Sequence, residues 1–565
     1  MEKILKEWNR WQELAVDDLD LQFDLSEMQF DEEKRRDCFY RNLEFGTGGL
    51  RGVIGAGTNR MNIYVIQKAT QGLANYLLKK YKNPSAAIAY DSRIKSNLFA
   101  REAAKVLAGN GIKVYIYEEL MPTPALSFAV RYLKCQAGIC VTASHNPANY
   151  NGYKVYGEDG CQITLTAAEK ILDEIEQIDP FKDVVKLDWE NGLEINRICF
   201  IPEIVKEAYI EAVYKETRGR ISTDLYVVYT PLHGAGRACV LEILKRMGVK
   251  QVTVVNEQEE PDGNFPTCPY PNPEREEAME LGFALCNKVN ADLLLATDPD
   301  CDRVGAAVKC GNTYRMISGN EMGVLLLDYI ARIRKEKGSM PERPLAIKTI
   351  VTTDLAVKVA AHYGIEVLNV LTGFKFIGEQ IGQLEKTAES ERYILGFEES
   401  YGYLSGTYVR DKDAVNASAL ICEMAAYYKT KGLSLAERME AIYKQYGYYQ
   451  NILLDFNFEG AKGITTMRSL MVRLRNGSVP LLEGLNVSEM KDYQLGIKGL
   501  PKADVLEYHL DRGDKVIIRP SGTEPKIKIY LFVCRENSEQ LRLASQKLED
   551  LINQVFKQYR EKPAE

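Results

Sequence analysis

Short β-branched runs alternate with longer helical stretches along this chain, and this alternation constrains the fold more than any other feature of the sequence. Repeated strand–helix alternation is typical of α/β domains, in which helices cover a sheet. The first block contains three predicted strands, at 86–91, 113–118 and 137–143, and three predicted helices, near 61–82, 97–110 and 124–134.

The same pattern occurs twice more before it changes. The predicted strands of the second and third blocks lie at 224–230, 252–256 and 291–298, and at 345–351, 366–372 and 393–398. The last block differs, because three predicted strands, at 505–510, 514–520 and 527–533, precede one long predicted helix at 537–559. We therefore predict three similar α/β domains and a smaller α+β C-terminal domain, with bounds 1–205, 206–318, 319–446 and 447–565.

Charge and composition exclude several function classes. The 565 residues carry a net charge of −7, and the sequence pI is near 5.6, which argues against a nucleic-acid or anionic-membrane binder. No apolar run approaches the roughly 18 residues that a membrane span needs. The first twenty residues alternate charged and apolar side chains, which predicts an amphipathic surface helix and lacks the apolar core of a signal peptide. Twelve scattered cysteines without a Cys-x-x-Cys pair favour a cytoplasmic protein with free thiols.

A polar loop follows the third predicted strand of each of the first three blocks. The loops are TASHNP at 142–147, DPDCDR at 298–303 and FEESYG at 397–402. Ligands of α/β sheets gather beyond the carboxyl ends of the strands. We therefore expect the three loops to face one shared cleft.

Ser144, in the first loop, is a candidate nucleophile. An acyl-transfer triad is poorly supported, because the chain has no Gly-x-Ser-x-Gly elbow and only four histidines, His145, His233, His362 and His509. A phosphoserine is a second possibility, since it carries nearly two negative charges and oxygens that bind a metal. The simplest alternative is an Asn-Pro turn whose hydroxyl has no special role.

Three carboxylates alternate in the second loop, at Asp298, Asp300 and Asp302, and would repel one another unless a cation lay among them. The loop is not an EF-hand, because its sixth and twelfth positions hold Arg303 and Lys309 instead of glycine and glutamate. Mg²⁺ prefers few carboxylates together with a phosphate oxygen, which a phosphoserine would supply. A solvated acidic turn, or a phosphatase with Asp298 as nucleophile, is a weaker interpretation.

Two further segments have the composition of ligand-binding loops. The stretch RPSGTEPKIK, 519–528, combines a glycine with hydroxyl and basic groups, from Arg519 to Lys528, as in a phosphate clamp. A plain β-hairpin loop is the alternative. Glu398 and Ser400 have the acceptors and the hydroxyl that hold sugar hydroxyls. Neither a Gly-x-x-x-x-Gly-Lys-Ser/Thr loop nor Gly-x-Gly-x-x-Gly occurs, so the sequence indicates phosphate chemistry without a nucleotide donor.

Together these segments resemble the α-D-phosphohexomutase superfamily, in its phosphoglucomutase/phosphopentomutase branch. The resemblance rests on GTGGLRG at 46–52, TASHNP, Asp-x-Asp-x-Asp-Arg, GFEESY and RPSGTEPK in this order, and it runs from about Phe45 to Tyr530. It implies a phosphosugar mutase whose α/β domains, with mixed sheets, and α+β C-terminal domain surround a central cleft. Tyr401-Gly402 departs from the glycine and histidine of many members, and Pro299 and Cys301 stand where many have glycines.

The resemblance also implies a role for each motif residue. Ser144 would carry the phosphate, Asp298, Asp300 and Asp302 would hold one Mg²⁺ per chain beside it, and Arg303 would contact the transferring phosphoryl group. Glu398 and Ser400 would bind sugar hydroxyls. The residues implied to grip the non-reacting phosphate are Arg519, Ser521, Gly522 and Thr523, with Lys528 in the same segment. The residues implied to lie near the reacting groups are Arg51, His145, Lys154 and Lys375.

The expected reaction is the interconversion of glucose 1-phosphate and glucose 6-phosphate through a phosphoserine enzyme and glucose 1,6-bisphosphate. A phosphopentomutase or phosphomannomutase with the same mechanism is one alternative, and a glucose-1,6-bisphosphate synthase that uses an acyl-phosphate donor is another. A non-catalytic phosphosugar sensor is a third. The expected partner is a small phosphosugar, with neither nucleic acid nor membrane, and the sequence predicts no particular oligomeric state.

Overall fold

The computed structural model describes residues 2–46, 48–221, 223–458, 461–477, 485–497, 499–521 and 526–561. These residues form two compact units. The first unit is Met1–Gly319 with Phe374–Ser434, and the second is Asn320–Gly373 with Leu435–Glu565.

Three short helices begin the first unit, namely α1 (Glu2–Leu14), α2 (Leu19–Glu27) and α3 (Glu32–Phe39). The predicted N-terminal amphipathic helix is present as α1, which buries Trp8 and Trp11 and exposes its charged face. Trp11 contacts Phe39, Tyr64 and Phe181 edge-on, at ring-centroid distances of 5.8, 5.7 and 5.4 Å. These aromatic contacts attach the N-terminal helices to the first α/β domain.

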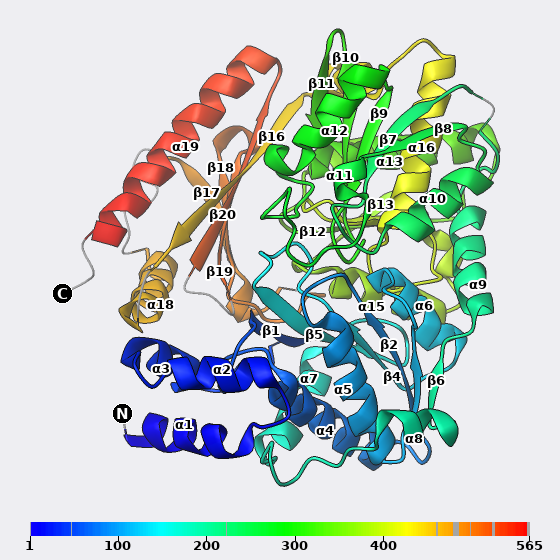
Figure 1. The fold of residues 1–565 in the computed structure, drawn as a ribbon. Helices are drawn as coiled ribbons and strands as arrows, with labels where there is room; N and C mark the ends of the chain where they lie inside the picture. Colours follow the sequence, from blue (N-terminus) through cyan, green and yellow to red (C-terminus); the bar gives the residue numbers. More distant parts are fainter. Residues whose placement is uncertain are drawn as a thin grey trace. The chain divides into compact units, whose positions relative to one another are not determined.

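The first sheet has six strands in the order β1-β5-β4-β2-β3-β6. They are β1 (Gly49–Val53), β2 (Ser85–Tyr90), β3 (Lys113–Ile116), β4 (Ala137–Val141), β5 (Tyr150–Gly157) and β6 (Ile198–Phe200). β4, β2, β3 and β6 are parallel, whereas β5 is antiparallel to both β4 and β1. Its helices are α4 (Ile63–Lys80), α5 (Ser96–Gly109), α6 (Thr123–Tyr132), α7 (Leu165–Glu176), α8 (Trp189–Glu194) and α9 (Glu203–Lys215), several of which are seen around the sheet in Figure 1.

The second sheet has five strands in the order β11-β10-β9-β7-β8. They are β7 (Tyr226–Thr230), β8 (Gln251–Val254), β9 (Leu293–Thr297), β10 (Val304–Cys310) and β11 (Thr313–Ile317). β7 is parallel to β8 and β9, and β10 is antiparallel to β9 and β11. The helices are α10 (Arg237–Arg246), α11 (Asn256–Glu259) and α12 (Glu276–Val289).

The last segment of the first unit contains the third polar loop. Its elements are α15 (Phe374–Lys386), a 3₁₀ turn (Ser390–Arg392), β14 (Tyr393–Phe397), β15 (Tyr403–Leu404) and α16 (Ala414–Thr430). β14 is fully buried and pairs antiparallel with β15, so the loop between them has a fixed start and a fixed end.

The second unit contains a parallel strand pair and an antiparallel sheet. The first part comprises α13 (Gly319–Glu336), β12 (Leu345–Thr349), α14 (Leu355–His362), β13 (Glu366–Val370) and α17 (Leu435–Tyr446), with β12 parallel to β13. The sheet has the order β16-β20-β19-β18-β17, with all neighbours antiparallel. Its strands are β16 (Tyr448–Asn457), β17 (Val487–Asp492), β18 (Leu506–Leu510), β19 (Lys515–Pro520) and β20 (Lys526–Arg535).

Two helices, α18 (Ala461–Arg475) and α19 (Ser538–Glu561), belong to this sheet, and α19 lies along it in Figure 1. Short 3₁₀ turns span Tyr493–Leu495 and Asp511–Gly513. Alternate residues of β19, Val516 and Ile518, are fully buried in a core with residues of α18 and α19. The opposite alternate residues, Lys515 and Arg519, therefore point to the other face of the sheet.

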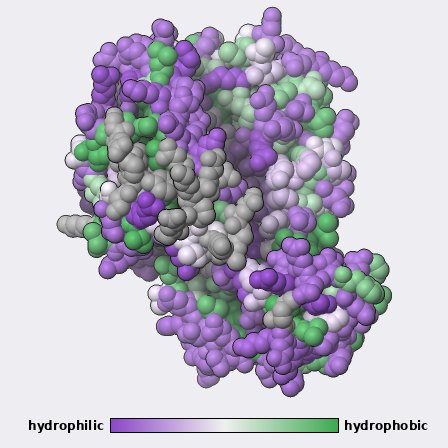
Figure 2. Space-filling view, turned by 90° about the vertical axis from the view of Figure 1, so that its left-hand side faces the viewer, coloured by the Kyte–Doolittle hydropathy of each residue, from purple (hydrophilic) through white to green (hydrophobic). Residues whose placement is uncertain are grey.

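The predicted fold class is confirmed: three α/β domains with mixed sheets precede a β-rich C-terminal domain. Among the described residues, no helix is both long and apolar enough to cross a membrane. On the face shown in Figure 2, hydrophilic residues predominate and hydrophobic residues form small groups.

Candidate active site

The three polar loops meet within the first unit. The Ser144 hydroxyl, beyond β4, donates to Asp298 Oδ2, beyond β9, over 2.7 Å. The backbone N–H of Val304, at the end of the second loop, donates to the Tyr401 carbonyl of the third loop over 3.1 Å. Strand ends from three parts of the chain thus converge on one group of polar side chains.

Each of these loops contains one non-glycine residue in the left-handed region. The φ angles are 53° at Ser144, 51° at Cys301 and 65° at Tyr401. Such backbone is unfavourable for L-residues and persists where the surroundings fix it. At Ser144 the N–H donates to Thr142 Oγ1 over 2.8 Å, and the residue is only 3% exposed.

Arg93 holds the Ser144 loop in place. This arginine follows β2, is 3% exposed and forms an ion pair with Asp91 at 3.5 Å. Its guanidinium donates to four backbone carbonyls of the loop, those of Ser144, Asn146, Pro147 and Tyr150. One rigid five-donor group therefore fixes the whole turn on which Ser144 lies.

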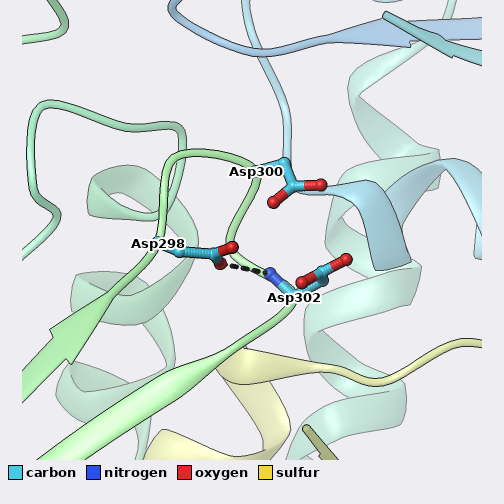
Figure 3. A group of neighbouring side chains, drawn as sticks. All are labelled: Asp298, Asp300 and Asp302. Carbon is cyan, nitrogen blue, oxygen red and sulfur yellow. Dashed lines mark hydrogen bonds between the residues drawn. The ribbon is translucent and has the colours of Figure 1, made fainter. Parts of the chain in front are cut away.

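The carboxylates of the three aspartates lie close together (Figure 3). Each is at most 1% exposed, and one carboxylate oxygen from each lies within 4.8 Å of the others. Asp298 Oδ1 accepts the backbone N–H groups of Asp302 and Arg303 over 3.2 and 3.0 Å. The loop backbone thereby fixes the first carboxylate.

Two lysines flank the carboxylates. Lys154, on β5, donates to Asp300 Oδ2 over 2.8 Å and to Asp302 Oδ2 over 3.4 Å. Lys412, between β15 and α16, lies 2.7 Å from Asp302 Oδ2. Burial favours the neutral form of both lysines, but the adjacent carboxylates outweigh it and raise the pKa of Lys154 and of Lys412 well above the ordinary value. Both are therefore cations at neutral pH.

The carboxylates retain capacity for a metal ion. Among the described residues, Asp300 Oδ1 and Asp302 Oδ1 are buried and have no hydrogen-bond partner. Burial and the charges of Asp300 and Asp302 raise the pKa of Asp298 well above its ordinary value. For Asp300, Lys154 and Lys412 outweigh burial and hold its pKa low. Buried acceptors on three converging carboxylates suit a hard divalent cation, so the group fits a metal ion.

His145 and the two predicted arginines lie around the Ser144 loop. His145 Nδ1 is 3.2 Å from Ser144 Oγ, and burial, with the charges of Arg303 and Arg51, lowers the pKa of His145 well below its ordinary value. Arg51 donates to Asn146 Oδ1 over 3.1 Å. Arg303 donates to Glu274 Oε1 over 3.0 Å. The histidine is therefore neutral beside the serine, between two cations.

Glu398 is a buried carboxylate in the third loop, and burial raises its pKa to about 7. The nearby charges of Lys412 and Arg303 oppose this effect. Ser400 is two residues farther along and half-buried. Lys375 lies at the start of α15, beside Cys161 and Glu379, where burial lowers its pKa.

The predicted phosphate clamp lies in the second unit, where Gly522 and Thr523 fall outside the described residues. Arg519, at the end of β19, is opposite Lys528 on β20 and donates to Thr372 Oγ1. The Ser521 N–H donates to the Lys526 carbonyl over 2.7 Å. β19 and β20 are antiparallel neighbours, so the described ends of this segment belong to a hairpin, and its phosphate-binding role stays a prediction.

Four residues of the site were not predicted from the sequence, namely Arg93, Thr123, Glu274 and Lys412. Thr123, at the start of α6, donates through its hydroxyl to Asp300 Oδ2 over 3.0 Å. Arg93 follows the end of β2, so the rule that selected the three loops would also have selected it. Lys412 lies in the run Arg-Asp-Lys-Asp, whose alternating charges are the one available signal.

Comparison with known proteins decides the family. Sequence models described as phosphoglucomutase/phosphomannomutase, alpha/beta/alpha domains I, II and III, match residues 42–182, 207–311 and 318–446. The chain belongs to this family. Phosphoglucomutase of Staphylococcus saprophyticus is 38% identical over 524 residues, which are 90% of this chain and 94% of the relative. Phosphoglucomutase of Staphylococcus aureus strain USA300 is 37% identical over 555 residues, 96% of this chain and 98% of the relative.

Solved structures support the same fold. The open form of parafusin, a phosphoglucomutase from Paramecium, has a TM-score of 0.69 at 18% identity, covering 91% of this chain and 96% of that one. A phosphoglucomutase/phosphomannomutase family protein from Burkholderia thailandensis has a TM-score of 0.67 at 18% identity, covering 92% and 98%. The family models and the curated relatives confirm the predicted superfamily.

The metal-binding capacity of the aspartates can be tested without an activity assay. Replacing Asp300→Asn removes one anionic ligand while keeping the side-chain shape, so we expect Mg²⁺ affinity to fall at least about tenfold. Isothermal titration of the full-length chain with Mg²⁺ measures this change. The exposed Asp224, replaced by Asn, is the matched control. Equal affinities in the two variants would contradict a metal site at the aspartates.

The role of Arg93 can be tested on the backbone itself. Lysine cannot reach four carbonyls, and each lost hydrogen bond to a charged donor is worth about 1.5–3 kcal/mol, so Arg93→Lys should speed amide exchange around the Ser144 turn at least about tenfold. Hydrogen–deuterium exchange read by mass spectrometry gives the rate. Arg101→Lys, at an exposed arginine of α5, should leave the turn unchanged. Unaltered protection in Arg93→Lys would remove Arg93 from this role.

Proposed function

We propose that this chain is a phosphoglucomutase, which interconverts glucose 1-phosphate and glucose 6-phosphate through phosphorylated Ser144. The observation that supports the proposal most strongly is the hydrogen bond from Ser144 to Asp298, because it joins the serine to the group of three buried carboxylates. The relatives named phosphoglucomutase over more than nine-tenths of their own length support the same activity.

In the first step, phosphorylated Ser144 is the donor. The bond between Ser144 Oγ and phosphorus breaks as an oxygen of the sugar forms a bond to phosphorus. The hydroxyl proton of the sugar passes to a base, and the released Ser144 Oγ takes up a proton. The product is glucose 1,6-bisphosphate. In the second step the other phosphate returns to Ser144, so the enzyme regains its phosphoserine and the sugar leaves with its phosphate moved. Positioning and charge compensation supply most of the catalysis in such transfers.

Asp298, Asp300 and Asp302 would hold one Mg²⁺. When bound, this ion offsets charge on the phosphoryl oxygens. Lys154 and Lys412 remain protonated beside the same carboxylates, so they contribute positive charge where negative charge develops. Neutral His145 is the group near Ser144 Oγ that can accept a proton.

The remaining predicted residues would bind the sugar and its second phosphate. Glu398 and Ser400 would accept and donate hydrogen bonds to ring hydroxyls, and Arg519, with Ser521, Gly522, Thr523 and Lys528, would hold the phosphate that is not reacting. Arg51, Arg303 and Lys375 would contact the reacting groups. All twelve cysteines are free thiols, which supports a cytoplasmic location.

The carrier role of Ser144 gives a direct test. Ser144→Ala removes the oxygen that takes the phosphate, so we expect mutase turnover to fall by about three decades or more while the protein stays folded. A coupled assay of glucose 6-phosphate formation measures turnover, and intact-mass analysis of the wild type should show a phosphorylated fraction. Ser339→Ala, at an exposed serine, should retain full activity. Near-normal turnover in Ser144→Ala would refute the mechanism.

The substrate assignment is tested by comparing kcat/KM for glucose 1-phosphate, mannose 1-phosphate and ribose 1-phosphate, with Mg²⁺ and a trace of bisphosphate. Lost hydroxyl contacts cost enough to give a preference for glucose of about ten- to a thousandfold. A higher value for ribose 1-phosphate would make the enzyme a phosphopentomutase with the same site. Steady turnover without an acyl-phosphate donor distinguishes a mutase from a bisphosphate synthase.

A further inference from the structure

A cavity in the second unit, lined by charged and by apolar side chains, lies apart from every residue assigned above. Its volume is about 270 Å³, and its walls come from β12, β13, β17, β18, β19 and the segment after Tyr493. Among the described residues, three lysines line it, Lys348, Lys491 and Lys515, against one carboxylate, Glu507. Ile350 and Leu368 supply an apolar part of the wall.

The two inner lysines are buried. Lys348 is 1% exposed and Lys515 is 7% exposed, although lysine is almost never buried without a partner. Asp354, outside the cavity wall, bridges them, with Oδ1 3.0 Å from Lys348 Nζ and Oδ2 2.9 Å from Lys515 Nζ. The single Asp354 carboxylate therefore forms ion pairs with both ammonium groups.

Both ammonium groups keep donors available. An ammonium has three N–H donors. Among the described residues, Lys348 uses two of them, for Asp354 and for the Thr352 carbonyl at 3.0 Å. Lys515 uses one, for Asp354, and lies over the Phe532 ring at 4.3 Å. Burial lowers the pKa of Lys348, and the neighbouring charge of Lys515 lowers it further against the effect of Asp354.

The carboxylate of the cavity is already occupied by its own neighbours. Glu507 Oε2 accepts the Tyr493 hydroxyl over 2.6 Å, and Glu507 Oε1 lies 2.6 Å from His509 Nε2. Lys491, one-third exposed, lies at the more open part of the wall, 3.6 Å from Glu507. The excess of positive donors is therefore on the side of Lys348 and Lys515.

We infer that this cavity binds a small phosphate-bearing anion, at a site separate from the Arg519 loop. Lysine ammoniums bind phosphate as point charges, and the free donors of two buried lysines provide such a set. Lys491 adds a third positive charge at the more open part of the wall, so its removal should also weaken binding of the anion. Lys515 and Arg519 are four residues apart on one strand, which places the cavity about 13 Å from the clamp arginine along β19.

The cavity is connected to the clamp through two strands. β19 runs from Lys515 to Arg519, and the chain runs from Asn369 on β13 to Thr372, whose hydroxyl accepts from Arg519. An anion that orders both strands at the cavity fixes both partners of this hydrogen bond. Occupancy should therefore lower the KM for a phosphosugar, an effect that rests on the proposed function, whereas the binding itself does not.

The test is isothermal titration of the full-length chain with inorganic phosphate in EDTA, where the aspartates of the first unit repel anions. The background variant is Arg519→Ala, which removes the clamp arginine. We expect one saturable site to persist in this background, and to weaken at least tenfold when Lys348→Met or Lys491→Met is added. Lys358→Met, an exposed lysine of α14, is the matched control and should leave the site unchanged.

Lys491 is partly exposed, so its variant keeps the test valid if Lys348→Met fails to fold, as judged by circular dichroism. Loss of all phosphate binding with Arg519→Ala alone would overturn the inference. So would unchanged affinity in a folded Lys348→Met or Lys491→Met variant. Tighter binding of succinate than of phosphate would overturn the assignment to a phosphate group. The titration measures binding and not turnover, so it tests the cavity alone. A failed mutase assay would contradict the proposed function and leave the result for the cavity unchanged.

Discussion

Compensation of three buried carboxylates is the constraint on which the rest of this site depends. Asp298, Asp300 and Asp302 are almost fully removed from water, and each isolated buried charge would cost several kcal/mol. Lys154 and Lys412, from two separate segments, form ion pairs with these carboxylates. Backbone N–H groups of the loop itself donate hydrogen bonds to them. The convergence of β5, the second loop and the segment before α16 is therefore an electrostatic requirement as well as a packing result.

These lysines and N–H groups do not use every oxygen of the three carboxylates, which leaves acceptors for a metal ion. Two carboxylate oxygens remain without partners among the described residues, and Ser144 hydrogen-bonds to the third carboxylate. A metal ion held by these aspartates would complete the charge balance beside Ser144. Arg93 fixes the turn whose carbonyls it binds, so the backbone at Ser144 is held in place by a buried guanidinium. Preorganisation of this kind is what phosphoryl transfer needs from a protein.

Many of the strands and helices, and the three polar loops of the site, were predictable from the sequence, because strand ends and polar loops have local signals. The predicted strand at 137–143 is β4 (Ala137–Val141), and the predicted helix at 537–559 is α19 (Ser538–Glu561). Strands β10 and β11 were missed although they form a hairpin across Gly311-Asn312, whose local turn signal was not used. Strands β1 and β5 were missed because each pairs with the other across a long sequence separation, with Gly49 opposite Lys154. Lys412 and Glu274 were missed for the same reason: a lysine or glutamate in a loop carries no local mark of the charge that it will meet across the fold. Thr123 was missed because a threonine at a helix start is common without a ligand.

The central claim is that Ser144 carries the phosphoryl group during turnover, and isotope transfer tests it most directly. The enzyme would be labelled with ³²P from glucose 1,6-bisphosphate, the labelled peptide identified, and the labelled enzyme mixed with unlabelled glucose 6-phosphate in a rapid-quench experiment. The account predicts label on Ser144 that passes to the sugar bisphosphate at a rate at least equal to kcat. Label on another residue, or transfer slower than kcat, would contradict it.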